Sequence, residues 1–318
     1  MSTDVGRALL VWPLLLSLIV VFGSSGFVLL AADAIYDLRA ATASLLPLWR
    51  ILAILACLVS PFVLLDMTGD MAGVSWKSAL PLVPEVLADT HAGRVWDWFL
   101  TVALLLLVSA CVPLGQSLRA IMLFVLTGLL LFLHSLLSHA VDKGALAIAF
   151  YFVHEVAVAL WLGSLMVLWI IARRGDAPKI KTEHAAQRVS EIAFWAVVAL
   201  VISGTYIAYN GLGLNLHQLL FSNYGRTLMV KVAVFLVVLA IGAYNRYWLV
   251  PAVADPAKRE TLVRNIGVES VILLFAVLGL AALLANTPPA HDTGGHAGHS
   301  MLAMISFDPI RRLLKGTP

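Results

Sequence analysis

Eight long apolar segments occupy most of this chain and limit the folds open to it. A helix needs about 20 residues to cross the hydrocarbon core of a bilayer, and each segment reaches that length. The bilayer core has no water to satisfy backbone N–H and C=O groups, so such segments must be helical. We therefore expect an all-α integral membrane protein, a bundle of eight transmembrane helices over Leu9–Ala32, Leu46–Leu65, Val95–Leu114, Ala120–Val141, Ala145–Ala172, Val189–Tyr209, Leu228–Val250 and Ile266–Ala285.

Composition supports this expectation and removes several classes of function. Hydrophobic residues make up 61% of the 318 residues and charged residues only 12%, which no soluble domain of this size could bury. The first segment is longer than the 7–15-residue core of a signal peptide, so we expect a retained span. The chain contains no P-loop, and Cys57 and Cys111 stand apart from each other. ATP-driven transport, a thiolate metal site and enzymatic activity are not expected.

Charge between the segments predicts the orientation. Eight spans place both termini on one face of the membrane. Lys and Arg are most frequent in the joints after the fifth and seventh spans, and such joints normally lie in the cytoplasm. Both termini would then be periplasmic, in a bacterial inner membrane. We expect one transmembrane domain over residues 1–286 and a periplasmic His/Met-rich tail over residues 287–318. The tail includes a short amphipathic segment suited to the membrane surface.

Three histidines lie inside apolar segments, beside the polar joint Asp142–Gly144. Ionisable groups at membrane depth are costly and usually functional. In an antiparallel helix pair, His134 and His154 both fall roughly 13–17 Å below the joint, and His139 about 7.5 Å nearer the outside. These residues predict an outer histidine, His139, above an inner pair, His134 and His154, more a ladder of metal ligands than a single cage. Glu155, beside His154, is placed either to accept a proton or to orient a neighbouring ligand. The alternative is that each histidine only hydrogen-bonds a neighbouring helix.

Methionines near the outer mouth point to copper as the metal. Imidazole suits several transition metals, whereas thioethers favour Cu(I), and no cysteine set accompanies these histidines. Met67 and Met71 share a helical face if their helix continues, beside Asp66 and Asp70. We expect a weak copper entry site there. The alternative is a helix end in which methionine fills gaps in the packing.

The tail sequence HDTGGHAGHS is rich in glycine and histidine, a composition that binds metals without a fold. Its ligands would be His291, His296 and His299, with two methionines following. We expect a collecting arm for Cu(I) or Cu(II).

One further polar group stands in the eighth span. Glu269 is expected to pair with Arg246 or Arg264 at the cytoplasmic side.

Several motifs resemble the copper resistance protein D family. The stretch SHAVDKG…FVHEVAVALWLGSL resembles the family signature GHA…H-x-x-A-x-x-x-W-x-G-G-L, with Gly163-Ser164 in place of Gly-Gly. Further matches lie in order within residues 85–251, in the stretches Thr90–Trp96, Ser203–Thr205, Tyr224–Lys231 and Ala243–Arg246, and at Pro251.

This resemblance implies an inner-membrane copper-handling protein that works with a periplasmic copper carrier of the CopC type. It carries over His139 and His154 as functional histidines but not His134 or the tail. We expect copper transport from periplasm to cytoplasm. Two alternatives remain open: a b-type haem electron carrier, because histidines on facing helices can ligate haem iron, and a non-transporting factor that delivers copper to a membrane cuproenzyme.

Overall fold

The computed structural model describes residues 2–31, 38–138, 140–173, 179–213 and 215–285, and these residues form helices joined by short turns. The helices are α1 (Ser2–Leu30), α2 (Leu38–Ala72), α3 (Trp76–Ala79), α4 (Val83–Asp89), α5 (His91–Cys111), α6 (Gln116–Leu136), α7 (Ala145–Arg173), α8 (Lys179–Leu212), α9 (Leu216–Phe221), α10 (Asn223–Tyr244), α11 (Pro256–Val271) and α12 (Leu278–Ala285). Asn245–Leu249 and Ile272–Val277 are π-helical, and Leu80–Leu82, Val141–Lys143 and Val250–Ala252 are 3₁₀ turns.

Eight helical stretches of the described residues are long and apolar enough to cross a membrane, which confirms the predicted number. They are Val5–Leu30, Thr42–Ala72, His91–Cys111, Gln116–Leu136, Ala145–Ile170, Glu183–Leu212, Asn223–Ala252 and Pro256–Leu284. Several of these helices extend beyond the ends predicted from the apolar segments. Backbone hydrogen bonding continues the helix past the last apolar residue.

The predicted end of the fourth span at Val141 is wrong, since α6 ends at Leu136. Serine side chains explain the difference. The hydroxyl of Ser138 donates to the Ser135 carbonyl at 2.7 Å. The Ser138 hydroxyl oxygen also accepts from the Ala140 amide at 3.2 Å. Such local side-chain bonds compete with helix continuation. The apolar pattern does not register this competition.

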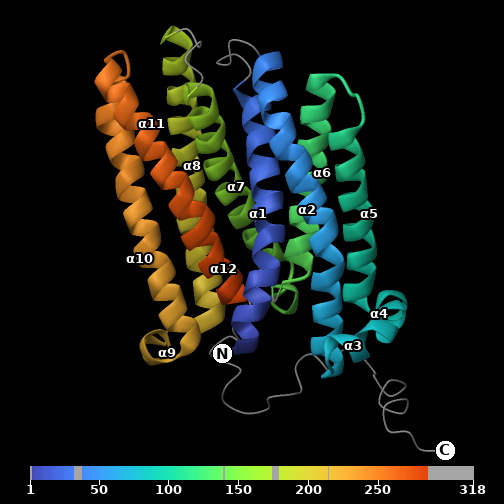
Figure 1. The fold of residues 1–318 in the computed structure, drawn as a ribbon. Helices are drawn as coiled ribbons and strands as arrows, with labels where there is room; N and C mark the ends of the chain where they lie inside the picture. Colours follow the sequence, from blue (N-terminus) through green and yellow to red (C-terminus); the bar gives the residue numbers. More distant parts are fainter. Residues whose placement is uncertain (1, 32–37, 139, 174–178, 214, 286–318) are drawn as a thin grey trace, which may run out of the picture.

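The helices run up and down, and Figure 1 shows where the joints gather. The lower end of the bundle, as drawn there, carries α3, α4, α9 and the joint between α6 and α7. The upper end carries the last turns of α7, the first turns of α8 and the α10–α11 connection. The two ends of the described chain meet at the lower end, because Ala8 and Leu15 of α1 pack against Ala282 of α12.

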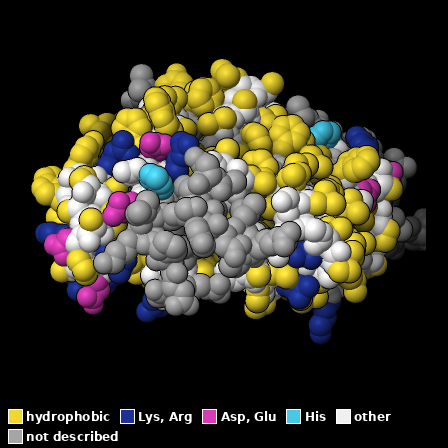
Figure 2. Space-filling view, turned by 90° about the horizontal axis from the view of Figure 1, so that it is seen from above, with side chains coloured by type: hydrophobic (Ala, Val, Ile, Leu, Met, Phe, Trp, Pro, Cys, Tyr) yellow, Lys and Arg dark blue, Asp and Glu magenta, His cyan; other side chains and the backbone are white. Residues whose placement is uncertain are grey.

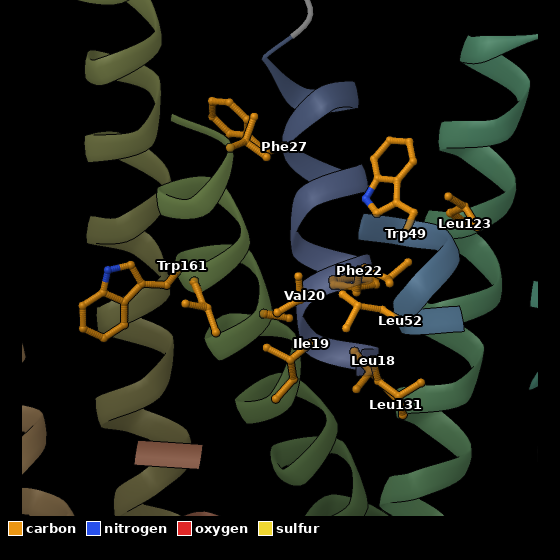
Figure 3. Packing of buried hydrophobic residues seen from close by; sticks show 14 of the residues in the cluster. Leu18, Ile19, Val20, Phe22, Phe27, Trp49, Leu52, Leu123, Leu131 and Trp161 are labelled. Atoms are coloured by element: carbon orange, nitrogen blue, oxygen red, sulfur yellow. The ribbon is translucent and has the colours of Figure 1, made fainter. Parts of the chain in front are cut away.

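Helix α1 is the centre of the bundle, packed against α2, α6, α7 and α12. Figure 3 shows its side chains between Trp49 and Leu123 on one side and Trp161 on the other. Buried Trp49 donates its indole N–H to Ser24 on α1 at 2.8 Å. This bond satisfies a polar group that would otherwise be orphaned inside the protein.

Helices α1 and α7 cross in direct backbone contact. A Cβ built on Gly23 would overlap the carbonyl of Ala159, and one built on Gly163 would overlap the backbone of Gly23. Small residues at such a crossing let membrane helices approach closely. The pair Gly163-Ser164 keeps this approach possible, since the Ser164 hydroxyl folds back onto the Trp161 carbonyl.

The segment Thr90–Trp96 acts as a structural corner at the start of α5. Thr90 caps the helix by accepting from the Gly93 amide at 2.8 Å. A Cβ on Gly93 would overlap the backbone of Val86 in α4. Trp96 then reaches across to α2. The spacing of threonine, glycine and tryptophan is therefore explained by packing.

The lateral surface is apolar, as a membrane-spanning bundle requires. Large hydrophobic side chains such as Leu58, Trp98, Val125 and Trp195 are exposed around it. Figure 2 looks onto the upper end: hydrophobic side chains form the periphery, and Lys and Arg side chains lie at several places among them. The basic joints predicted to share one face of the membrane thus share one end of the bundle.

Candidate functional site

A hydrogen bond joins α6 to α7 at membrane depth. The Nδ1 atom of His134, in the last turn of α6, lies 2.6 Å from Oε1 of Glu155 on α7. The two side chains are only 20% and 9% exposed, so water screens this pair little. The second carboxylate oxygen, Oε2 of Glu155, is buried and has no hydrogen-bond partner among the described residues. The pair therefore retains one unused acceptor.

The bond to Glu155 decides which nitrogen of His134 is available. When the carboxylate accepts from Nδ1–H, the lone pair of a neutral imidazole is on Nε2. A carboxylate behind a histidine in this way fixes the ring orientation and raises its basicity as a metal ligand. Glu155 is thus suited to orient His134, which is one of the two roles expected for it.

His154 is held by a different neighbour, Ser203 on α8. Its Nδ1 lies 3.0 Å from the Ser203 hydroxyl oxygen, and that oxygen lies 2.6 Å from the Ala199 carbonyl. The carbonyl can only accept, so the one hydroxyl proton is donated to Ala199. Nδ1 of His154 must then donate to Ser203, which leaves the Nε2 lone pair free. The ring lies against Gly204, next to Ser203, where an added Cβ would still make only an ordinary contact, 3.5 Å from Cε1 of His154.

His134 and His154 are at a similar depth but bind different partners. Glu155 follows His154 directly in α7, so the bond to His134 puts both histidines at one level, as the antiparallel geometry predicted. His134 is engaged from α6 toward α7, whereas His154 is engaged from α7 toward α8. Within the described part of the chain, no three His, Cys, Asp or Glu side chains converge as a metal cage. The arrangement is two separate stations.

Charged and phenolic groups surround these stations. The charge of Lys231 on α10 is close enough to act on His154. Tyr151, one turn before Glu155, lies within electrostatic range of that carboxylate and of Tyr224. A cation arriving here would meet the attraction of Glu155 on one side of α7 and the repulsion of Lys231 on the other.

Met67 and Met71 share a helical face, as predicted, because α2 continues to Ala72. The sulfur of Met67 accepts from the Trp96 indole N–H at 3.2 Å. This contact agrees with the alternative in which Met67 fills a gap in the packing. The sulfur keeps a second lone pair that remains able to bind a metal ion. A copper-binding role for the two methionines stays a prediction.

The neighbouring carboxylates are engaged within the protein. Arg7 of α1 forms ion pairs with both Asp66 and Asp70, and Trp76 donates to Asp66 at 2.8 Å. These contacts fasten the lower ends of α1, α2 and α3 together. Asp66 and Asp70 therefore have a structural role beside the predicted entry site.

Four other predicted ligands lie outside the described residues: His139, His291, His296 and His299. Their metal-binding roles stay predictions.

The expected pairing of Glu269 with Arg246 or Arg264 is wrong. Glu269 instead accepts from Trp161 of α7 at 3.0 Å and from Asn245 at 3.1 Å. Arg246 donates to the backbone and hydroxyl oxygens of Ser190 on α8, at 2.6 and 2.7 Å. The Arg246 guanidinium is directed toward α8, and the Glu269 carboxyl toward α7. Which neighbour each side chain meets depends on how its helix is rotated about its own axis.

Ser203 was not predicted as a partner of His154. Its segment, Ser203–Thr205, stood out only as a small-residue match in the sixth span. The contact joins residues 49 positions apart in the chain, and nothing in the apolar pattern shows which face of α8 meets α7.

Three curated proteins show similarity to this chain over long stretches. Copper resistance protein D of Pseudomonas syringae pv. tomato is 25% identical over 291 residues, covering 83% of this chain and 93% of that protein. Inner membrane protein YebZ of Escherichia coli K12 is 26% identical, covering 64% and 70%. Copper transport protein CutJ of Bacillus subtilis is 26% identical over 70% of this chain, but the match spans only 42% of CutJ. No solved structure matches.

Two family models match consecutive parts of the chain. The model described as Copper resistance protein D-like, N-terminal domain matches residues 2–148. The model described as Copper resistance protein D matches residues 183–284. With eight membrane-length helices and an inner-membrane relative, the chain is a multi-pass protein of the inner membrane. It belongs to the copper resistance protein D family.

Proposed function

We propose that this protein carries copper ions across the bacterial inner membrane, from periplasm to cytoplasm. The observation that carries the proposal is the pair of membrane-depth histidines, His134 and His154. Each has Nδ1 in a hydrogen bond that leaves Nε2 free as a ligand. The names of two relatives, one for copper resistance and one for copper transport, support copper as the ion. Imidazole nitrogen is a suitable ligand for it.

The direction follows from charge. The upper end of the bundle carries the basic joints and would face the cytoplasm, so both termini, α3, α4 and α9 would face the periplasm. An inside-negative potential favours cation entry by about 2.3 kcal/mol per charge for each 100 mV. Import therefore needs no nucleotide hydrolysis.

The proposed path begins at the periplasmic end. The tail ligands His291, His296 and His299 collect the ion, with Met67 and Met71 at the mouth. His139 receives the ion at the α6–α7 joint. A periplasmic copper carrier of the CopC type would supply it.

The inner part of the path uses the two described stations. Nε2 of His134, oriented by Glu155, binds the ion first, and Nε2 of His154, oriented by Ser203, takes it next. Transfer of the ion from one ring nitrogen to the other needs only these two ligands and no closed cage. This agrees with two separate stations at one depth. Glu155 offsets part of the ion's charge within the membrane.

Uptake by liposomes containing the purified chain tests the proposal. With an inside-negative potential, His134→Ala and His154→Ala should each abolish most copper entry, measured with a fluorescent chelator inside the vesicles. His184→Ala, at the exposed upper end of α8, serves as the matched control and should transport normally. Undiminished entry in either span variant would contradict the path. A Soret band in the purified protein would point instead to haem.

A further inference from the structure

Glu269 is a carboxyl buried near the middle of the eighth span, at 1% exposure. Its two oxygens accept separately, Oε1 from the Trp161 indole and Oε2 from the Asn245 amide. Asn265 donates in turn to the Asn245 oxygen at 3.0 Å. No basic side chain of the described residues forms an ion pair with this carboxyl. An ionised carboxylate without a cation is costly at such a depth, whereas the two N–H donors stabilise the carboxylate. These opposing effects suit a carboxyl that exchanges its proton.

A cavity of about 230 Å³ opens beside this carboxyl. It lies between α7, α8, α10, the π-helical segment Asn245–Leu249 and α11, and its polar lining includes Ser190 and Arg246. Each water occupies about 30 Å³ of liquid, so the space accommodates several. Arg246 and Tyr247 are the other charged or titratable side chains of the described residues that line it. Most of the lining is apolar, and its polar groups, which include Ser190, Asn245 and Arg246, are those past which protons would reach Glu269 from the upper part of the bundle.

The surrounding backbone is shaped around the carboxyl. A Cβ on Gly242 of α10 would lie 3.3 Å from Oε1 of Glu269, so the glycine allows a close approach. Asn245 is the first residue of one π-helical segment, and the other begins three residues after Glu269. Single π turns within helices frequently accompany functional sites.

Helix α7 connects this carboxyl to the histidine stations. Trp161 follows His154 by seven residues, which is nearly two full turns, so the two side chains lie on one face. They are separated by about 10 Å along the helix axis. Glu269, bound to Trp161, therefore lies on the side of His154 that faces the upper end.

The groups at Glu269 suit a proton better than a metal ion. The indole and amide N–H groups point at its oxygens, and the Asn245 oxygen is already used by Asn265. A metal ion needs several lone-pair donors, and copper prefers nitrogen or sulfur. A proton needs only one carboxylate oxygen.

We propose that Glu269 is an exchangeable proton-binding site that releases its proton when a copper ion occupies His154. The release step rests on the proposed copper path. The carboxyl dissociates to a carboxylate and a proton, and the proton leaves through the cavity. The arriving cation favours the carboxylate by Coulomb attraction along α7. A neutral His154 that binds through Nε2 has no proton of its own to lose.

Infrared spectroscopy of the full chain in lipid, without copper, tests the proton site alone. A band from a buried protonated carboxyl should be present in the natural protein, shift in D₂O and titrate with pH. Glu269→Gln should remove it, whereas Glu260→Gln, an exposed site on the same helix, should not. If Glu269→Gln does not fold, Trp161→Phe should move the band to higher frequency by removing one hydrogen bond. A band unchanged by both variants, or no exchange with D₂O, would overturn the site.

Proton release on adding Cu(I) to the weakly buffered protein tests the coupling. The natural protein and Glu260→Gln should release protons in proportion to bound copper. Glu269→Gln should bind the same copper with loss of that release. Equal release from Glu269→Gln would overturn the coupling. Failure of copper to bind any variant would instead contradict the proposed copper path, and the copper-free infrared result would still decide the proton site.

Discussion

Glu155 and His134 join α6 to α7 through a 2.6 Å contact between Oε1 and Nδ1 at membrane depth. The two helices that it joins are largely apolar in sequence. Because an unpaired carboxylate there would be costly, the bond also determines how the two helices align. One pair thus sets both the packing of the joint and the orientation of a candidate ligand.

Replacing Glu155 by glutamine should weaken copper binding while keeping the shape of the side chain. Outer partners of histidine ligands typically contribute 10–100-fold to metal affinity, so we expect a loss of roughly tenfold or more. Competition with a chromophoric chelator measures it. Glu191→Gln, on an exposed pair with Arg188 at the upper end, is the control. Equal affinity in the two variants would remove Glu155 from the site.

Ser203→Ala should disturb His154 without touching the metal position itself. Without the hydroxyl, Nδ1 loses its acceptor and the ring is no longer held in one tautomer, so copper affinity should fall by roughly tenfold. Ser203→Thr should restore it. Ser109→Ala, which removes a hydroxyl bonded only to the Leu105 carbonyl, controls for the loss of a helix-bound serine. If all three variants bind alike, the hydrogen bond has no part in ligation.

The close α1–α7 crossing predicts that one added methyl group, in Gly163→Ala, lowers the stability of the protein markedly. Gly163→Ala would force its Cβ into the backbone of Gly23, so the helices must separate. Overpacking of this kind costs about 1–3 kcal/mol, and more where backbone cannot move. A thermal-shift measurement in detergent should show a clearly lower Tm. Gly279→Ala, in α12 with open space around it, should leave Tm nearly unchanged. The same Tm for both would mean that this crossing is not tight.

The fold followed from apolar length alone because the bilayer allows lone spans only as helices. Helix ends did not: α6 ends early through Ser135 and Ser138, whose hydrogen bonds leave no mark on hydropathy. The common depth of His134 and His154 followed from the rise per residue on either side of a short joint.

The partners of the polar groups were beyond the sequence, because they depend on how each helix is rotated. Ser203 meets His154, and Trp161 meets Glu269 across 108 residues, only once α8 and α11 turn these faces toward α7. The helical period states which residues share a face. It does not state which neighbour that face will meet.

Removing residues 287–318 should weaken the collection of copper without slowing its transport through the membrane spans. A tethered metal-binding arm raises the ion's local concentration, so its loss should raise the copper concentration for half-maximal uptake by roughly tenfold. The maximal rate should stay the same because His134 and His154 remain. Liposome uptake over a range of copper concentrations measures both quantities. The triple variant His291→Ala, His296→Ala and His299→Ala keeps the tail length and should reproduce the shift. A lower maximal rate with unchanged half-saturation would mean that the tail acts within the path and not before it.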